Sequence, residues 1–117
     1  MKYFNKFIEF SKVLGSIGTN PETGKLENSS LETEVRRALS NLDDKLKLAN
    51  IKKTNVMKCT VFLTTMDHYG PVNTLYAEYF EGHRPARSCV AVKELPKGAL
   101  FEIEAIGVEE DEMSPKL

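Results

Sequence analysis

Residues 84–106 read RPARSCVAVKELPKGALFEIEAI, the most regular pattern in the chain. The run 88–92 is short, apolar and β-branched, and the run 100–108 alternates apolar with charged side chains; both patterns are typical of strands. Pro96 and Gly98 stand between the two runs and indicate a turn. The stretch therefore predicts a β-hairpin.

The predicted hairpin carries an arginine near the start of its first strand and two glutamates, Glu102 and Glu104, on one face of its second strand. An arginine binds a planar carboxylate with two parallel hydrogen bonds, and a carboxylate can activate water or hold a cationic group. One interpretation is a site for a small acid. The other is an ordinary solvated strand face with a surface ion pair, and spacing alone leaves both open.

Two helices are expected before this hairpin. The first covers residues 30–50, where apolar side chains recur every three or four positions, and Ser29 or Ser30 provides its N-cap. The second begins at Asp67 or Pro71 and continues to residue 80, with an apolar and aromatic stripe on one face. Both stripes are typical of helices that pack on a core.

The expected element order is β-β-α-β-α-β-β, because residues 3–19 read as two short strands, or one bent strand, broken near Gly15 and Gly18. This order favours a two-layer α+β domain in which two helices cover one face of a mixed sheet. We expect a single domain over residues 1–109. The acidic, aperiodic tail 110–117 is expected to fray.

The strand expected at residues 54–64 bears on association. Alternation places Met57 and Cys59 on the side of the helices and Phe62 on the side that no helix covers. A sheet face that is uncovered and partly apolar predicts self-association.

Composition excludes several classes of protein. The chain has 117 residues, 41% of them apolar, and a net charge of -1, which favours neither nucleic acid nor an anionic membrane as a partner. No apolar run approaches the roughly 20 residues of a membrane helix, and the N-terminus is unlike a signal peptide. Cys59 and Cys89 lack the spacing of a redox motif, so we expect reduced thiols and a cytoplasmic protein. His68 and His83 are isolated, and no metal site is expected.

Several segments together resemble the RidA family, also called the YjgF or L-PSP family. The matching segments are 20–24 (NPETG), 59–63 (CTVFL), 72–76 (VNTLY), 85–90 (PARSCV), 95–97 (LPK) and 101–105 (FEIEA). The resemblance extends over roughly residues 10–108.

This resemblance implies a chorismate-mutase-like fold and a homotrimer. The uncovered sheet faces would close into a barrel-like core, with a pocket in each of three clefts between subunits. The implied activity is hydrolysis of reactive 2-imino acids (2-iminobutanoate and 2-iminopropanoate) to 2-oxo acids and ammonia, with no cofactor and no metal.

The resemblance also implies roles for particular residues. Arg87 matches the arginine that holds the substrate carboxylate, and Glu102 matches the glutamate that positions and deprotonates water. Cys89 contributes its backbone N–H, Gly15 its carbonyl, and Asn73 lines the pocket. The thiol of Cys89 has no histidine placed to activate it.

The chain departs from the family pattern at one wall of this pocket. Leu14-Gly15-Ser16 stands where the family usually has Ser-Gly-Gln. The family's longer arm with Gly-Pro-Tyr-Ser-Gln has no clear counterpart, so Tyr3 is the candidate for the pocket tyrosine. Substrate range is expected to depend on this altered wall.

Two other functions are compatible with the same residues. One is binding of small carboxylates, such as 2-oxo acids, in the same cleft without turnover. The other is RNA cleavage or translation inhibition, activities also assigned to the family; the near-neutral charge argues against a phosphate-binding surface.

Overall fold

The computed structural model describes residues 11–110 of the chain. Its elements are β1 (Ser11–Ser16), α2 (Leu31–Leu48), β2 (Val56–Leu63), α3 (Tyr69–Phe80), β3 (Ala86–Ala91) and β4 (Phe101–Val108). The strands form one mixed sheet in the order β1-β4-β2-β3. β4 pairs antiparallel with both β1 and β2, whereas β2 and β3 run parallel.

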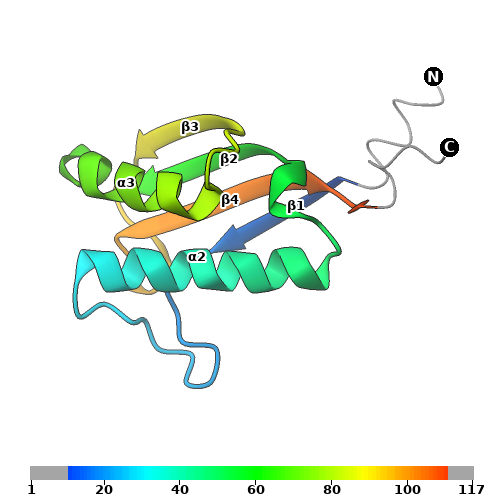
Figure 1. The fold of residues 1–117 in the computed structure, drawn as a ribbon. Coiled ribbons are helices and arrows are strands. Elements are labelled where there is room, and N and C mark those ends of the chain that lie inside the picture. Colours follow the sequence, from blue (N-terminus) through cyan, green and yellow to red (C-terminus); the bar gives the residue numbers. More distant parts are fainter. Residues whose placement is uncertain (1–10, 111–117) are drawn as a thin grey trace, which may run out of the picture.

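Both helices lie on the same face of this sheet, so the domain has two layers (Figure 1). The core lies between the layers: it combines the stripe Val35–Leu46 of α2 and the aromatic face of α3 with alternate residues of β2 and β4. Phe101, Ile103 and Ala105 of β4 are at most 1% exposed. The expected α+β fold is confirmed, and the opposite face of the sheet carries no helix of the described chain.

The predicted hairpin between residues 84 and 106 is wrong. β2 lies between β3 and β4, so these two strands do not pair. Burial explains the order: β4 is covered along its whole inner face and takes a central position, whereas β3 is mostly exposed and takes an edge. β3 instead pairs with β2 in parallel. The chain connects these two strands through helix α3, because parallel neighbours need a crossover connection.

The helix starts were predicted within a few residues. Ser30 is the N-cap of α2, because its hydroxyl accepts a hydrogen bond from the Thr33 N–H. Before α3, a short 3₁₀ turn intervenes at Met66–His68, and Thr65 rather than Asp67 caps it. Thr and Asp are both favourable cap residues, so the sequence alone did not show which of Thr65 and Asp67 is the cap.

A bulge corrects the predicted facing of β2. The register shifts between Val56 and Lys58, so Val56 is buried and Met57 is 43% exposed. A bulge inserts one residue and reverses the alternation before it. Beyond the bulge, Cys59 faces the core and Phe62 the other side, as predicted.

The predictions for the two ends of the chain fall largely outside the described residues. Of the strand or strands expected over residues 3–19, the structure describes β1, and Tyr3 lies outside the described range. Residues 111–117 of the expected tail also lie outside it. Glu110, the first residue of that tail, accepts a hydrogen bond from Asn55 and pairs with Lys52.

Candidate functional site

The sheet register places the two central candidates, Arg87 and Glu102, on opposite faces. Arg87 is paired with Cys59 of β2, and Glu102 is paired with Phe62. Side chains of paired residues point to the same side of a sheet, and residues three apart in one strand point to opposite sides. Because Cys59 is buried under the helices, Arg87 lies on the helix side and Glu102 on the uncovered side.

Arg87 is held in place by side chains of α3. Its guanidinium donates to the Asn73 amide oxygen and, over 2.9 Å, to the Tyr69 hydroxyl. The guanidinium carbon lies 4.8 Å from the centre of the Tyr76 ring, a cation–π distance. A hollow of about 260 Å³ opens beside this group, lined by Asn73, Tyr76, Ala77, Phe80, Gly82, His83, Arg84, Pro85 and Arg87. The predicted neighbours Arg87 and Asn73 are thus brought together, and α3 presets the orientation of the arginine.

Cys89 lies on the same side of β3 as Arg87, because it pairs with the buried Val61. The Val92 N–H bonds to the Leu63 carbonyl of β2. Successive N–H groups of a strand alternate between its two edges, so the N–H of Cys89, three residues earlier, faces the free edge. Burial raises the pKa of the Cys89 thiol, although Arg87 partly opposes this, and a neutral thiol is a poor nucleophile.

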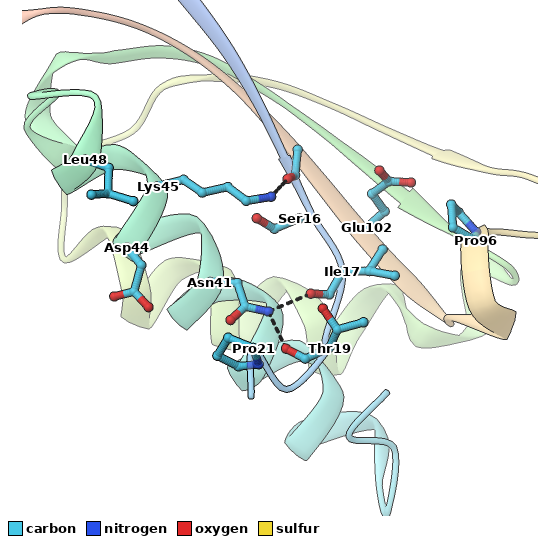
Figure 2. A pocket seen from close by; sticks show the side chains of 11 residues that line it. Ser16, Ile17, Thr19, Pro21, Asn41, Asp44, Lys45, Leu48, Pro96 and Glu102 are labelled. Atoms are coloured by element: carbon cyan, nitrogen blue, oxygen red, sulfur yellow. Dashed lines mark hydrogen bonds between the residues drawn. The ribbon is translucent and has the colours of Figure 1, made fainter. Parts of the chain in front are cut away.

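Glu102 lines a second, larger hollow. It has a volume of about 510 Å³ and is lined by Gly15, Ser16, Ile17, Thr19, Pro21, Asn41, Asp44, Lys45, Leu48, Pro96 and Glu102 (Figure 2). A Cβ built on Gly15 would lie 3.6 Å from Glu102 Oε2, so the predicted Gly15 and Glu102 are direct neighbours across β1 and β4. Burial and the nearby Glu104 raise the pKa of Glu102, whereas Lys45 lowers it. A carboxyl with a raised pKa is suited to act as a base near neutral pH.

Sequence reasoning missed Lys45 in this hollow and named Ser16 only as part of the altered wall. Lys45 extends from α2 and donates to the Gly15 carbonyl. The Ser16 hydroxyl is buried and finds no hydrogen-bond partner within residues 11–110, so a ligand or water in the hollow could supply one. In sequence, Lys45 is one of several charged residues on an amphipathic helix; only the fold shows which of them reaches the strand.

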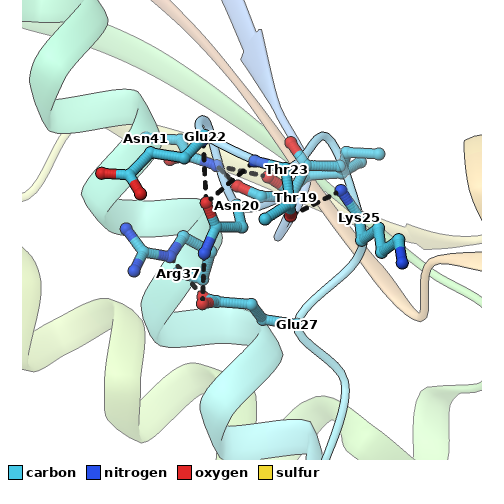
Figure 3. Close-up of polar contacts among 9 residues, drawn as sticks. Thr19, Asn20, Glu22, Thr23, Lys25, Glu27, Arg37 and Asn41 are labelled. Atoms are coloured by element: carbon cyan, nitrogen blue, oxygen red, sulfur yellow. Dashed lines mark hydrogen bonds and ion pairs between the residues drawn. The ribbon is translucent and has the colours of Figure 1, made fainter.

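The wall of the larger hollow is fixed to α2 by a polar network. Asn41 donates to the carbonyls of Ile17 and Thr19, at 3.0 and 2.7 Å (Figure 2). Further along the loop, Glu27 accepts from Arg37 and from the Asn20 side chain (Figure 3). These contacts hold the chain after β1 against the helix and keep Gly15 and Ser16 at the rim of the hollow.

The candidate residues therefore form two groups in one protomer. Arg87, Asn73 and Cys89 belong to the edge next to α3, and Gly15 and Glu102 belong to the β1–β4 side. Sequence reasoning from the hairpin placed an arginine and the glutamates side by side, and the sheet order separates them. Either group alone offers half of a site: a cation for a carboxylate, or a base for water.

Residues 11–110 form neither a cluster of metal ligands nor a membrane-spanning helix. There, no three His, Cys, Asp or Glu side chains gather as a metal site would require. Neither helix of residues 11–110 combines the length and apolarity needed to cross a bilayer.

Comparison with known proteins gives a consistent set of matches. The family model described as endoribonuclease L-PSP matches residues 3–109. A rat protein named 2-iminobutanoate/2-iminopropanoate deaminase is 44% identical over 97 residues, which cover 83% of this chain and 71% of the rat protein.

Solved structures agree with this result. A Thermotoga maritima structure described as an endoribonuclease superposes with a TM-score of 0.79 at 45% identity, covering 83% of this chain and 76% of the other. The Escherichia coli protein TdcF, solved with bound serine, superposes with a TM-score of 0.79 at 31% identity, covering 86% and 82%.

Proposed function

The chain belongs to the endoribonuclease L-PSP family, and we propose that it is a 2-iminobutanoate/2-iminopropanoate deaminase, which hydrolyses reactive 2-imino acids to 2-oxo acids and ammonia. The single observation that carries this proposal is the similarity to deaminases of that name over 83% of the chain. The family match over residues 3–109 includes both half-sites. We also propose a cytoplasmic location, in keeping with two cysteines that are free thiols.

Arg87 binds the substrate carboxylate in this proposal. Its guanidinium is already oriented by Asn73 and Tyr69, so little conformational entropy is lost when the carboxylate binds. The outward N–H of Cys89 is a second donor on the same edge. Together they fix the planar acid so that the imine carbon is exposed to attack.

Glu102 supplies the base. It takes a proton from water while the oxygen bonds to the carbon of the protonated imine, giving a carbinolamine. The proton then passes from Glu102 to the amine nitrogen. The C–N bond breaks as the hydroxyl group gives its proton to Glu102 and becomes the carbonyl, so the 2-oxo acid and ammonia leave; the proton that the iminium brought stays on Glu102 until ammonia or solvent takes it. The iminium is itself electrophilic, so orientation and one base are sufficient and the scheme needs no cofactor.

We propose that a complete site forms between two protomers of a homotrimer. Arg87 and Glu102 lie on opposite faces of one sheet, so a single protomer does not present both to one small substrate. Association through the uncovered face would bring the Glu102 side of one protomer to the Arg87 edge of the next. The exposed Val13 and Val90 support such association.

A coupled assay tests the activity. A threonine or serine dehydratase generates the imine, and release of the 2-oxo acid is followed with and without this protein. We expect acceleration that falls by at least about 100-fold in Arg87→Ala and in Glu102→Gln, because each variant removes a group that the scheme requires. Arg36→Ala is the matched control: Arg36 pairs with Glu32 and Glu78, lines neither of the two hollows described above, and its loss should leave the protein active. A well-folded assembly that gives no acceleration would overturn the proposal.

Mixing the two inactive variants tests the divided site. When Arg87→Ala and Glu102→Gln chains are unfolded together and refolded, random assortment should restore about a quarter of the wild-type activity, because one cleft in four receives both intact residues. Activity that stays absent in the mixture would place both residues of each site in one protomer.

The alternatives give different results in the same experiments. A carboxylate-binding protein would bind 2-oxo acid through Arg87 without accelerating imine loss. An RNA-directed function would appear as cleavage or binding of RNA at physiological salt, and the chain's net charge of -1 argues against it.

A further inference from the structure

Lys45 stands out because its contact is unusual for a helix-surface lysine. It lies in the last turns of α2, yet its ammonium reaches the edge strand β1 and donates to the Gly15 carbonyl. Figure 2 shows the side chain extended from the helix toward the strand. A neutral carbonyl does not cancel the charge, and within residues 11–110 no carboxylate lies at ion-pair distance from the Lys45 ammonium.

Gly15 connects this lysine to Glu102. The Gly15 carbonyl accepts from Lys45, and the side-chain position of Gly15 is 3.6 Å from Glu102 Oε2. All three residues line the same hollow. Because Gly15 has no side chain, position 15 adds no atoms between Glu102 and the backbone that Lys45 contacts.

The other charges around Glu102 are mostly negative. Glu104 lies two residues along the same face of β4 and raises the pKa of Glu102, as burial does. Asp44 lines the hollow as well. β2 also places a lysine on this face. This residue, Lys58, pairs with Ile106 of β4, and its ammonium donates to the Thr60 hydroxyl. Lys45 is therefore the cation that opposes protonation of Glu102.

We propose that Lys45 is a positioning residue of the deaminase site: it fixes the Gly15 carbonyl at the rim of the hollow and supplies the positive charge that keeps Glu102 ionised for water activation. This inference rests on the proposed function for its catalytic meaning. The electrostatic coupling itself is a property of the folded chain.

A carboxyl titration tests the coupling without any turnover. The Glu102 side-chain carboxyl is followed by carbon NMR in the intact assembly, with Glu102→Gln used to assign its signal. In Lys45→Met, which keeps the length of the side chain and removes its charge, we expect the titration midpoint of Glu102 to rise. Lys45→Arg should keep it near the wild-type value.

Lys47→Met is the control, because it removes the same charge from the same end of α2. Lys47 is 76% exposed and pairs with Asp43, away from the hollow. The Lys47→Met variant should therefore leave the titration midpoint of Glu102 unchanged. An unchanged midpoint in Lys45→Met, or an equal rise in Lys47→Met, would overturn the inference.

The pH profile of kcat/KM gives the second readout. In Lys45→Met we expect kcat/KM to fall about two- to fivefold on the acid side of the profile, because one partly exposed charge interaction has about this size. On the alkaline side kcat/KM should change little, since Glu102 is ionised there in both proteins. A loss of equal size at every pH would mean that Lys45 has only a structural role. If the wild-type protein shows no turnover, the proposed function fails, while the titration still decides the coupling.

Discussion

Arg87 is oriented before any ligand arrives. A free arginine on an edge strand would sample many rotamers, but here the Asn73 amide and the Tyr69 hydroxyl hold the guanidinium from the side of α3. The ring of Tyr76, also on α3, lies 4.8 Å from the guanidinium carbon and adds a cation–π contact. Binding of a carboxylate then costs less side-chain entropy than it would at an unsupported arginine.

Removing the Tyr69 hydroxyl should therefore weaken substrate binding. In Tyr69→Phe we expect KM to rise about three- to tenfold with kcat nearly unchanged, since one hydrogen bond to a charged group is lost and the base is untouched. Steady-state kinetics in the coupled assay measure both constants. Tyr79→Phe is the control: its hydroxyl bonds to Asp43 at 2.8 Å, remote from Arg87, so a similar rise in KM there would refute the role of Tyr69.

At the scale of elements, a buried glutamate connects the first turn of α2 to the start of β4. Glu34 is completely buried, and its Oε2 accepts from the N–H groups of Leu100 and Phe101 at 2.6 and 3.2 Å. The chain after β1 crosses the same turn so closely that a Cβ on Gly18 would lie 2.5 Å from the Glu34 carbonyl oxygen. This junction fixes where β4 begins, and with it the position of Glu102.

Glu34→Ala should destabilise the fold by about 2–4 kcal/mol, because two buried N–H groups lose their acceptor and a cavity remains. Glu34→Gln should cost less than Glu34→Ala, since its amide oxygen can accept both hydrogen bonds; its amide NH2 takes the place of Oε1, which is buried without a partner within residues 11–110, so some loss is expected. Urea unfolding at one fixed protein concentration compares the two. Equal losses would show that the negative charge, rather than hydrogen-bond acceptance, matters at this junction.

Local signals in the sequence identified the elements but not all of their neighbours. Capping at Ser30 and the helical stripe act within a few residues, so α2 could be predicted closely. Strand pairing depends on which faces become buried in the whole domain; residues 84–106 have the local form of a hairpin although β2 separates the two strands. Gly18 and Gly15 also looked alike, and only the fold shows that Gly18 is the one that a close approach requires.

At the scale of the whole molecule, the uncovered sheet face is the surface proposed for association. Val90 is paired with Phe62, so it lies on this face, and it is 45% exposed. Glu102 and Glu104 already give the same face negative charge. A further carboxylate there would have to be buried unpaired when protomers meet.

Val90→Glu should therefore raise the concentration needed for assembly by at least about tenfold and lower deaminase activity in parallel. Sedimentation velocity over a dilution series, with the coupled assay on the same samples, measures both. Met66→Glu adds the same charge at a residue of similar exposure in the turn before α3. If Met66→Glu dissociates the protein as readily as Val90→Glu does, the uncovered face is not the association surface.

The candidate site shows the same limit of sequence reasoning as the fold. Residue type and family resemblance were enough to select Arg87 and Glu102 as candidates. Their placement on opposite faces of the sheet could not be predicted, because it follows from the register of β3 and β4 with β2. Lys45 gave no signal at all, since its contact with Gly15 joins residues 30 positions apart.

Because Arg87 and Glu102 lie on opposite faces of the sheet, the specific activity of the proposed assembly depends on the concentration of the protein. Half-sites that separate on dilution lose turnover although every protomer stays folded, so specific activity should climb with protein concentration and level off once assembly is complete. A cell that lowered expression below this threshold would lose the activity faster than it lost the protein.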